Sequence, residues 1–274
     1  MFGSKGLRKL TSQPRRWGGL ARKAPGVYRL CSDSQSARTL WSLLGASESG
    51  QGRGEVPIRM RPLGGRSVLI RAGTTDAKVV WETFSGRYHL PPDELRPRTI
   101  WDLGANIGLT MAHMAVLYPE TRLIGVELDE ENARLCARNV APWAERCEMR
   151  RAAVWDSSGE VEYRAEQGHE WGFRVGGGDG ARRTAPALSL DELLAAGESD
   201  VIDYVKMDIE GAESRVLRHN TDWARHVRCI NVEIHDPYSL KECISDLARL
   251  GFDTEVEPRH RACVTGARRI PGAI

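Results

Sequence analysis

Two short runs of ionisable residues in the C-terminal half of the chain have the types and spacing needed for proton transfer. The first is Lys206-Met-Asp208-Ile-Glu210, and the second is Glu233-Ile-His235. Residues two apart in an extended strand point to the same face, so each run gathers its ionisable groups. An imidazole, with an ordinary pKa of about 6.5, is well suited to taking a proton from a hydroxyl near neutral pH. These five residues are the candidate catalytic groups.

A satisfied ion pair, such as Lys206 with Glu233, would also explain some of these charges. However, each run follows a predicted buried strand, where unpaired charges are costly. We therefore expect the groups to converge at a functional site, because perturbed ionisable residues gather at such sites.

A second set of residues has the pattern of a nucleoside-binding turn. Asp102 stands near the end of a predicted strand, and Gly104, Asn106 and Gly108 follow it as the chain runs into a helix. Gly104 permits a tight turn, and Gly108 lets the helix pack on the strand. Glu127 ends the next predicted strand, 23 residues after Gly104. A carboxylate at that place can accept hydrogen bonds from both hydroxyls of a ribose.

The residues around this turn favour S-adenosylmethionine over a dinucleotide. Asn106 replaces the glycine that lets a pyrophosphate approach, and Asp102 would repel that group. The same carboxylate would attract the sulfonium and amino groups of S-adenosylmethionine. Ala153 and Val154, at the end of the third predicted strand, suit an adenine, although core packing explains them equally well.

The apolar pattern predicts an α/β fold from about residue 98 onward. Strands alternate with helices, which indicates right-handed crossovers and a doubly wound, mostly parallel sheet of seven strands. The last two strands are joined by Pro258-Arg259-His260 without a helix, so we expect an antiparallel hairpin at one edge. The predicted strands are 99–103, 122–127, 148–155, 201–207, 229–234, 252–256 and 262–264, and the predicted helices are 107–118, 130–140, 188–196, 214–218 and 240–250.

The chain divides into three parts. Residues 1–55 form a basic extension and linker, residues 56–97 a segment that shapes the substrate site, and residues 98–274 the catalytic domain. Eight of the 39 basic residues and none of the 37 acidic residues lie in 1–30, so residues 31–274 hold 31 basic and 37 acidic residues, a formal charge of −6. We expect the basic segment to be a solvated leader, with an arm for anionic partners as the alternative.

Local patterns predict further elements around this frame. Residues 34–44 and 76–84 are expected to be helical, and a hairpin is expected around Gly64-Gly65. A short extra strand is expected over 161–164. Residues 165–187, which contain His169, Trp171 and Phe173, are expected to be an irregular loop that helps to shape the acceptor pocket.

Composition restricts the class of protein further. A hydrophobic content of 41% argues against disorder, and six scattered Cys without a C-x-x-C pair argue against a metal cluster or a disulfide scaffold. No uncharged stretch is long enough to span a membrane, and no secretory signal is recognisable. We expect reduced cysteines and a cytoplasmic location. The sequence leaves the oligomeric state open.

Three segments resemble the FkbM family of S-adenosylmethionine-dependent methyltransferases. They are Asp-Leu-Gly-Ala-Asn-Ile-Gly-Leu-Thr at 102–110, Lys-Met-Asp-Ile-Glu-Gly-Ala-Glu at 206–213 and Val-Glu-Ile-His at 232–235. The upstream segment 71–76, together with Tyr88, also fits the family. The resemblance covers roughly residues 66–256. Leu128 stands where the family pattern would place a proline after the acid, but Glu127 itself is present.

This resemblance implies a class I methyltransferase fold and methyl transfer, usually to a hydroxyl of a natural product or saccharide. It also implies that Thr75, Tyr88 and Leu128 contribute to the cofactor site. The partner would be a small-molecule acceptor.

The roles of the catalytic candidates follow from this implied reaction. His235 would be the general base. Asp208 would contact the cofactor amino group or the substrate, and Glu210 and Glu233 would orient His235 and the substrate hydroxyl. Lys206 would hold the carboxylates together. A divalent metal bound by Asp208, Glu210, Glu233 and His235 is an alternative that we do not favour.

Three other functions compete with this interpretation. An RNA methyltransferase could grip phosphates with residues 1–30, but the acidic remainder and the lack of an RNA-binding module argue against nucleic acid. Asp102 and Asn106 argue against a nicotinamide oxidoreductase. A non-enzymatic binding protein on the same fold would not need His235.

Overall fold

The structure, a computed structural model, describes residues 23–46, 54–165, 173–175, 182–197 and 199–268. The chain forms two compact units, residues 1–81 and 82–274. The boundary at 81/82 lies inside the segment 56–97 that the sequence analysis treats as one part.

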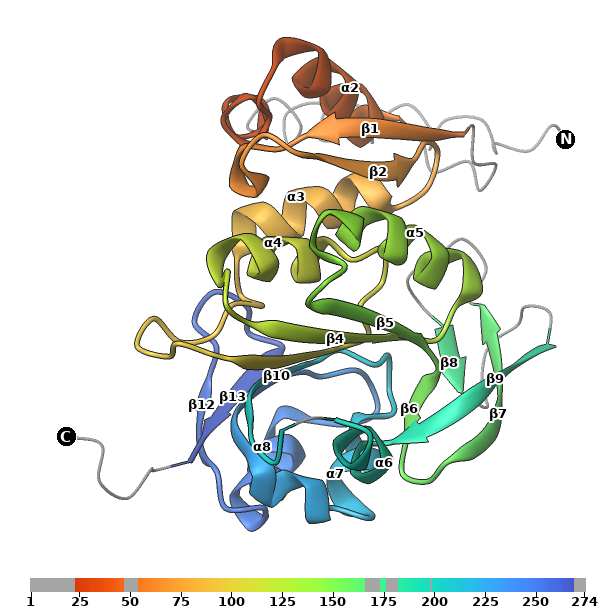
Figure 1. The fold of residues 1–274 in the computed structure, drawn as a ribbon, viewed down its shortest axis with the longest axis vertical. Coiled ribbons are helices and arrows are strands. Elements are labelled where there is room, and N and C mark those ends of the chain that lie inside the picture. Colours follow the sequence, from red (N-terminus) through yellow and green to blue (C-terminus); the bar gives the residue numbers. More distant parts are fainter. Residues whose placement is uncertain (1–22, 47–53, 166–172, 176–181, 198, 269–274) are drawn as a thin grey trace, which may run out of the picture. The chain divides into compact units, whose positions relative to one another are not determined.

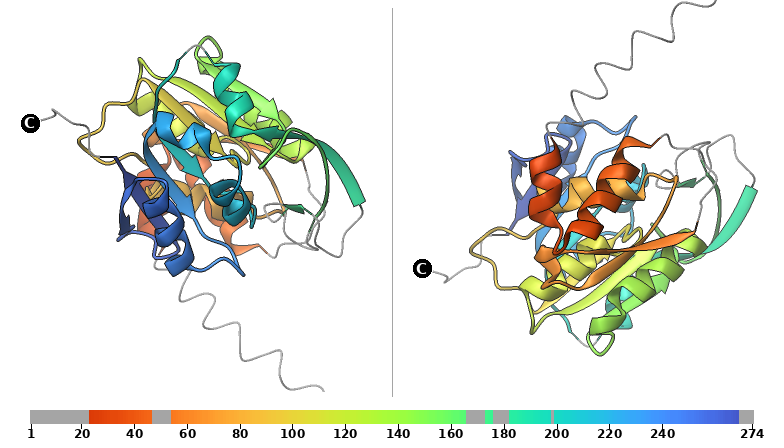
Figure 2. Two further views of the ribbon diagram at one scale, coloured as in Figure 1. Left: turned by 90° about the horizontal axis from the view of Figure 1, so that it is seen from below. Right: turned by 90° about the horizontal axis from the view of Figure 1, so that it is seen from above.

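The N-terminal unit is built around one hairpin. Strands β1 (Glu55–Arg59) and β2 (Ser67–Arg71) pair antiparallel, with Val56 opposite Ile70 and Ile58 opposite Val68. This confirms the predicted hairpin, whose turn contains the short helix η1 (Arg61–Leu63). Helix α2 (Ser34–Gly45) packs on β1 (Figure 2). Residues 23–30, predicted as part of a leader, are helical, and α3 (Asp76–Gly86) begins in this unit.

The C-terminal unit contains the predicted seven-stranded sheet. Its strand order is β12-β13-β11-β10-β3-β4-β5, and only β13 runs in the direction opposite to the other strands. The doubly wound, mostly parallel sheet and the edge hairpin are therefore confirmed. The strands are β3 (Thr99–Leu103), β4 (Arg122–Glu127), β5 (Cys147–Arg151), β10 (Ile202–Met207), β11 (Val227–Glu233), β12 (Asp253–Val256) and β13 (Cys263–Ala267).

Helices cover both faces of this sheet (Figure 1). Helices α4 (Leu109–Leu117) and α5 (Glu130–Val140) lie on one face. Helices α6 (Leu190–Ala195), α7 (Glu213–Arg218) and α8 (Leu240–Arg249) lie on the other. All six residues of β10 are buried, as expected for a central strand covered on both sides.

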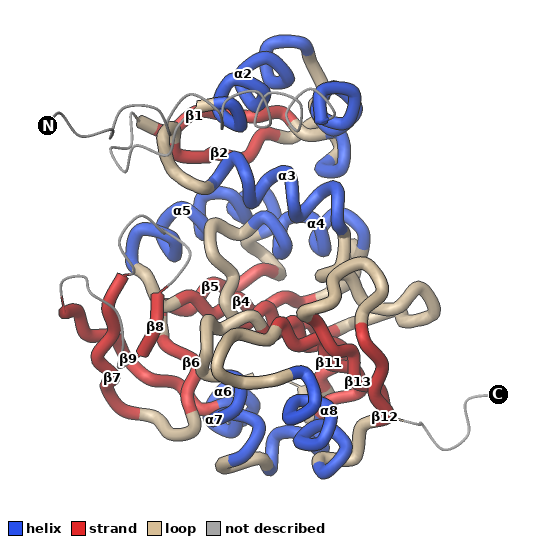
Figure 3. The backbone as a smooth tube through the Cα atoms, turned by 180° about the vertical axis from the view of Figure 1, so that it is seen from behind, coloured by secondary structure: helices blue, strands red, loops and turns tan. Residues whose placement is uncertain are grey.

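A second sheet of four strands differs from the sequence prediction. It contains β6 (Ala153–Trp155), β7 (Gly159–Ala165), β8 (Phe173–Val175) and β9 (Arg182–Ser189), in the order β6-β9-β7-β8. Figure 3 shows these strands beside the β4–β5 half of the large sheet. The predicted strand 148–155 is thus divided between β5 and β6. The prediction of an irregular loop at 165–187 was wrong for β8 and β9, because pairing with β7 overrides their weak local pattern.

The strand order places the functional segments side by side. Chain order reverses between β3 and β10, and ligands of such sheets bind beyond the strand ends at this point. Gly104, after β3, has φ of +82°, and a Cβ built on it would overlap the carbonyl oxygen of Asp208. Only glycine therefore lets the turn after β3 approach the end of β10 this closely.

Candidate active site

A pocket of about 570 Å³, including space open to solvent, lies beyond the carboxyl ends of β3, β4 and β10. Most of the predicted cofactor residues line it, and they are Gly104, Asn106, Glu127, Leu128, Ala153, Val154 and Asp208.

Glu127 is fixed at this pocket by two backbone hydrogen bonds. Its Oε2 accepts from the amide of Asn106 at 2.8 Å, and its Oε1 accepts from the amide of Asp129 at 2.9 Å. Asn106 has φ of +49°, so the turn after β3 is bent to deliver this amide. Burial raises the pKa of Glu127 to about 7, although the two hydrogen bonds oppose the shift. Glu127 is thus a preorganised acceptor whose free lone pairs can receive ribose hydroxyls.

Two of the predicted cofactor residues lie behind the pocket rather than on its wall. Asp102 is completely buried, is hydrogen-bonded by Thr110, and lies with Oδ1 3.4 Å from Lys206 Nζ. Gly108 begins α4, and a Cβ there would approach the sulfur of Cys136 to 2.7 Å. Both residues therefore act from behind the pocket. Asp102 forms an ion pair with Lys206, and Gly108 leaves room for the side chain of Cys136.

Lys206 connects this pocket to the catalytic candidates. Its ammonium lies 3.2 Å from Asp208 Oδ2 and donates a hydrogen bond to the carbonyl of Gly104 at 3.0 Å. Burial lowers its pKa, but the charges of Asp208 and Asp102 outweigh burial and raise the pKa overall. Lys206 forms its ion pairs with these two aspartates. The alternative raised from the sequence was an ion pair between Lys206 and Glu233.

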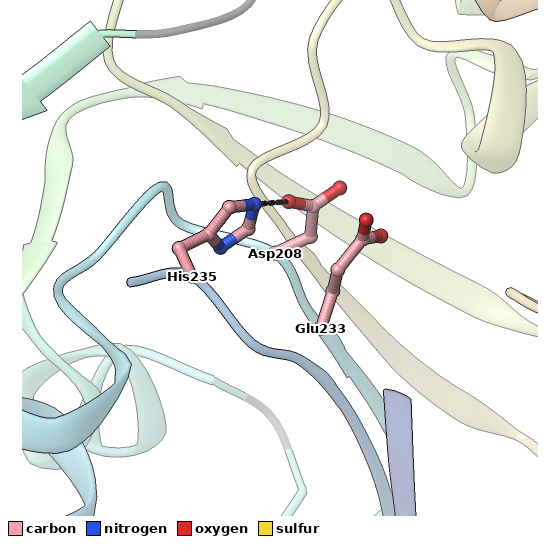
Figure 4. A group of neighbouring side chains, drawn as sticks. All are labelled: Asp208, Glu233 and His235. Atoms are coloured by element: carbon pink, nitrogen blue, oxygen red, sulfur yellow. Dashed lines mark ion pairs between the residues drawn. The ribbon is translucent and has the colours of Figure 1, made fainter. Parts of the chain in front are cut away.

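His235 is held by a carboxylate that the sequence analysis did not assign. Its Nδ1 lies 2.8 Å from Oε1 of Glu213, which is completely buried and also accepts from the amides of Ile209 and Gly211. The imidazole therefore donates through Nδ1, and its Nε2 is turned towards the other carboxylates. Nε2 lies 3.5 Å from Glu210 Oε2. It lies 3.7 Å from Asp208 Oδ1, the ion pair drawn in Figure 4.

The surrounding carboxylates favour the charged form of His235. Burial lowers its pKa, but the hydrogen bond to Glu213 and the charges of Asp208 and Glu210 outweigh burial and raise the pKa to about 9. Glu213, which had no predicted role, contacts Nδ1, and Glu210, which was expected to orient His235, lies beside Nε2. Glu213 stands in the quoted segment 206–213, but only the tertiary structure shows that it is buried against the imidazole.

Glu233 lies on the opposite side of Asp208 from His235 (Figure 4). Its carboxylate lies near His260, and the ring of His260 contacts the ring of Tyr88. Burial, followed by the charge of Asp208, raises the pKa of Glu233 to about 8. Burial and the charges of Glu233 and Asp208 also raise the pKa of Tyr88. Tyr88, predicted as a cofactor residue, therefore lies on the Glu233 side of the site and is not among the residues lining the cofactor pocket.

One group of described residues could hold a metal ion. Ligand atoms of Asp208, Glu233 and His235 lie within 4.8 Å of one another. Two carboxylates and an imidazole are suitable ligands for a divalent cation. Lys206 already places a positive charge 3.2 Å from Asp208, which disfavours a second cation there.

The remaining predictions for site residues are not resolved by this geometry. Thr75 is a buried residue of the N-terminal unit, just before α3, and its cofactor role stays a prediction. His169 and Trp171 lie outside the described residues, and Phe173 belongs to β8. Among the described residues, no helix is both long enough and apolar enough to cross a membrane.

Comparison with known proteins agrees with the resemblance seen in the sequence. The model of a family described as the methyltransferase FkbM domain matches residues 102–254. The hexuronic acid methyltransferase AglP of Haloferax volcanii is 25% identical over 162 residues. That match covers 59% of this chain and 66% of AglP, slightly less than two thirds of its length.

Solved structures show a fainter likeness. The precorrin-6y C5,15-methyltransferase of Geobacter metallireducens GS-15 has a TM-score of 0.43 at 12% identity, covering 69% of this chain and 87% of that one. The N-terminal domain of EvdMO1 with SAH bound has a TM-score of 0.41 at 20% identity, covering 71% and 80%. These scores are too low to support an argument, whereas the family model covers more than half of the chain. The chain therefore belongs to the family of FkbM methyltransferase domains.

Proposed function

We propose that this protein is an S-adenosylmethionine-dependent O-methyltransferase that modifies a hydroxyl of a small molecule, with His235 as general base. The observation that carries the proposal is the Glu213–His235 pair beside the pocket. The buried carboxylate holds Nδ1 at 2.8 Å, which leaves Nε2 facing the site where a hydroxyl would enter. This is the arrangement by which a carboxylate fixes the tautomer of a basic histidine.

The pocket residues fit S-adenosylmethionine. Glu127 would accept the ribose hydroxyls, Ala153 and Val154 would pack on the adenine, and Asp208 would face the amino group. Bound there, the cofactor supplies a methyl group on a sulfonium, which is already an activated leaving group. The carboxylates of this site favour such a positively charged ligand.

The chain's own residues would then align the acceptor and remove its proton. His235 Nε2 would accept the hydroxyl proton as the acceptor oxygen bonds to the methyl group, whose bond to the cofactor sulfur would break. S-adenosylhomocysteine and the methyl ether are the products. Holding the oxygen in line supplies much of the rate enhancement, since alignment replaces a bimolecular encounter.

The charge of the site favours a hydroxyl over a carboxylate acceptor. A carboxylate needs no general base to attack a methyl group, and Asp208 and Glu210 would repel it. The name of AglP points to a sugar acid as the acceptor of that relative. For this chain we infer methylation of a hydroxyl on a saccharide or another natural product.

The test compares His235→Gln with His219→Gln, a control at an exposed histidine. Methyl-labelled S-adenosylmethionine is offered with methyl glycosides, catechol and cyclohexanol, and S-adenosylhomocysteine affinity is measured by calorimetry. His235→Gln should lose at least about 100-fold in turnover, the usual contribution of a positioned base, while the affinity changes little. Unchanged turnover would exclude His235 as the base.

The same assay separates this mechanism from the metal-assisted alternative. Dialysis against EDTA should leave the rate unchanged, because the base acts without a metal. A rate that falls on dialysis and returns with Mg²⁺ would favour metal assistance by Asp208, Glu233 and His235 instead.

A further inference from the structure

The proposed proton transfer assigns no role to the candidate Glu233 or to two neighbouring side chains, Tyr88 and His260. Tyr88 follows α3, Glu233 ends β11, and His260 lies in the turn between β12 and β13. The rings of Tyr88 and His260 have centroids 4.4 Å apart and planes inclined at 34°. Nε2 of His260 lies 3.8 Å from Oε1 of Glu233. We call these residues the Tyr88–Glu233–His260 cluster.

The cluster is accessible but contains an unsatisfied polar atom. The side chain of His260 is 35% exposed and that of Glu233 is 18% exposed. Oε2 of Glu233 is nevertheless buried, and no described residue donates a hydrogen bond to it. A buried acceptor without a donor is costly, and native proteins rarely leave one unexplained. A bound molecule that donates a hydrogen bond would satisfy it.

The charges around the cluster restrict the chemistry of that donor. Asp208 lies next to Glu233 (Figure 4) and would repel an anionic ligand. Positive charge is already present, because Lys206 lies 3.2 Å from Asp208. A neutral hydroxyl is the donor that fits, and the ring of Tyr88 offers an apolar surface to the carbon skeleton that carries it.

Glu233 and His235 are close enough to serve one small molecule. They are two residues apart at the end of β11, and one ligand atom of each lies within 4.8 Å of the other. Two hydrogen bonds of about 2.7 Å, the usual length from a hydroxyl, can reach both groups from adjacent hydroxyls of one ring.

We propose that the Tyr88–Glu233–His260 cluster is an acceptor subsite for a ring with two adjacent hydroxyls. One hydroxyl is methylated opposite His235, while its neighbour donates a hydrogen bond to Glu233. The ring lies against Tyr88. This inference rests on the proposed function and adds a substrate class, the vicinal diol, which a saccharide or a catechol can supply.

The first arm of the test varies the acceptor of the unmodified protein. Initial rates with labelled S-adenosylmethionine are compared for methyl glycosides of mannose, galactose and glucose, for catechol, and for cyclohexanol, which has one hydroxyl. At least one diol should exceed cyclohexanol tenfold in kcat/KM. Transfer to the glycosides identifies a saccharide source, and transfer to catechol identifies an aromatic one. Equal rates for cyclohexanol and the diols would overturn the subsite.

The second arm varies the chain. Glu233→Ala should raise KM for the diol at least tenfold and leave S-adenosylhomocysteine affinity unchanged, because the lost contact is to the acceptor. Glu233→Gln, which keeps an acceptor oxygen, should restore part of the affinity. Glu255→Ala, at an exposed glutamate of β12, is the matched control and should behave as the unmodified protein.

The outcomes separate this inference from the proposed function. Methylation of a diol with unchanged KM in Glu233→Ala would overturn the subsite and leave the methyltransferase standing. Tight S-adenosylhomocysteine binding without methylation of any diol would overturn the substrate class. Failure to bind S-adenosylhomocysteine at all would overturn the proposed function itself.

Discussion

At the scale of single residues, the proposed chemistry depends on a contact between two side chains that are far apart in the chain. Glu213 accepts from His235 Nδ1 and from two backbone amides. Because the carboxylate is buried, its charge acts on the imidazole with little screening by solvent. The same contact that orients the base therefore also strengthens it.

This coupling predicts how the rate depends on pH. A histidine whose pKa is raised to about 9 is mostly protonated at neutral pH and must lose that proton to act as a base. The value of kcat/KM, which reports the free enzyme, should therefore increase with pH up to about 9.

Glu213→Gln should move this pH profile in a definite direction. Removal of the carboxylate charge lowers the pKa of His235, so the rise should occur at lower pH, while the maximal rate falls by about 10- to 100-fold as the base is held less well. Rate profiles between pH 6 and 10 measure both effects. A rise at the same pH in both proteins would contradict the coupling, and Glu255→Gln serves as the surface control.

At the scale of elements, hydrogen bonds join the turn after β3 to the end of β10. The amide of Asp208 donates to the carbonyl of Leu103 at 2.9 Å, and Lys206 donates to the carbonyl of Gly104 at 3.0 Å. These two hydrogen bonds link the turn predicted to bind the cofactor to the segment that holds the catalytic candidates. A change in one should appear in the other.

Gly104→Ala tests this dependence. The new Cβ would overlap the carbonyl oxygen of Asp208 and would also occupy a left-handed conformation, so we expect a loss of at least about 2 kcal/mol of unfolding free energy. S-adenosylhomocysteine affinity should fall as well. Urea unfolding and calorimetry measure the two losses.

Gly64→Ala is the matched control for that variant. It has a similar φ of +64° but meets only a flexible Arg66 side chain, at 3.3 Å. It should lose stability through backbone strain and keep its affinity. If Gly104→Ala binds S-adenosylhomocysteine as tightly as the unmodified protein does, then the turn tolerates a side chain.

At the scale of the whole molecule, a buried histidine pair makes folding sensitive to acid. His89 Nε2 lies 3.1 Å from His113 Nδ1, and both side chains are almost completely buried. Burial and then the charge of Arg87 lower the pKa of His113 to about 4. Burial and the neighbouring cations, His113 and Lys206 among them, also lower the pKa of His89 well below its usual range.

The sign of the effect follows from proton binding. In the unfolded chain a histidine has a pKa of about 6.5, so below that pH the unfolded state binds more protons than the folded state. The contribution of His113 to the free energy of unfolding is therefore fully present above about pH 6.5. It is lost as the pH falls towards about 4. For His113 alone, the loss between pH 7 and pH 5 is about 2 kcal/mol.

Urea unfolding at pH 7 and pH 5 measures this loss. His113→Gln should show a smaller decrease than the unmodified protein, whereas the exposed His219→Gln should show the same decrease. Glu127 and Glu233, whose pKa values are raised, titrate in the opposite sense, so the difference between variants isolates the histidine. An identical decrease in His113→Gln would contradict this assignment.

The sequence by itself determined the frame of the C-terminal unit. Alternating apolar strands and amphipathic helices, such as 240–250, depend on period and on local caps, and these can be read along the chain. The catalytic candidates around Asp208 and His235 could be predicted in the same way, because their residue types and their two-residue spacing are local features of the sequence. The family resemblance covers these same segments.

Only the tertiary structure decided which groups meet. It paired Glu213 with His235, placed Tyr88 beside Glu233, and formed β8 and β9 from a stretch without local strand character. Each of these results depends on contacts between segments far apart in sequence, whose burial and mutual charge no local pattern encodes. The ionisable residues at each strand end could therefore be predicted from the sequence. The residues that contact them and shift their pKa values could not.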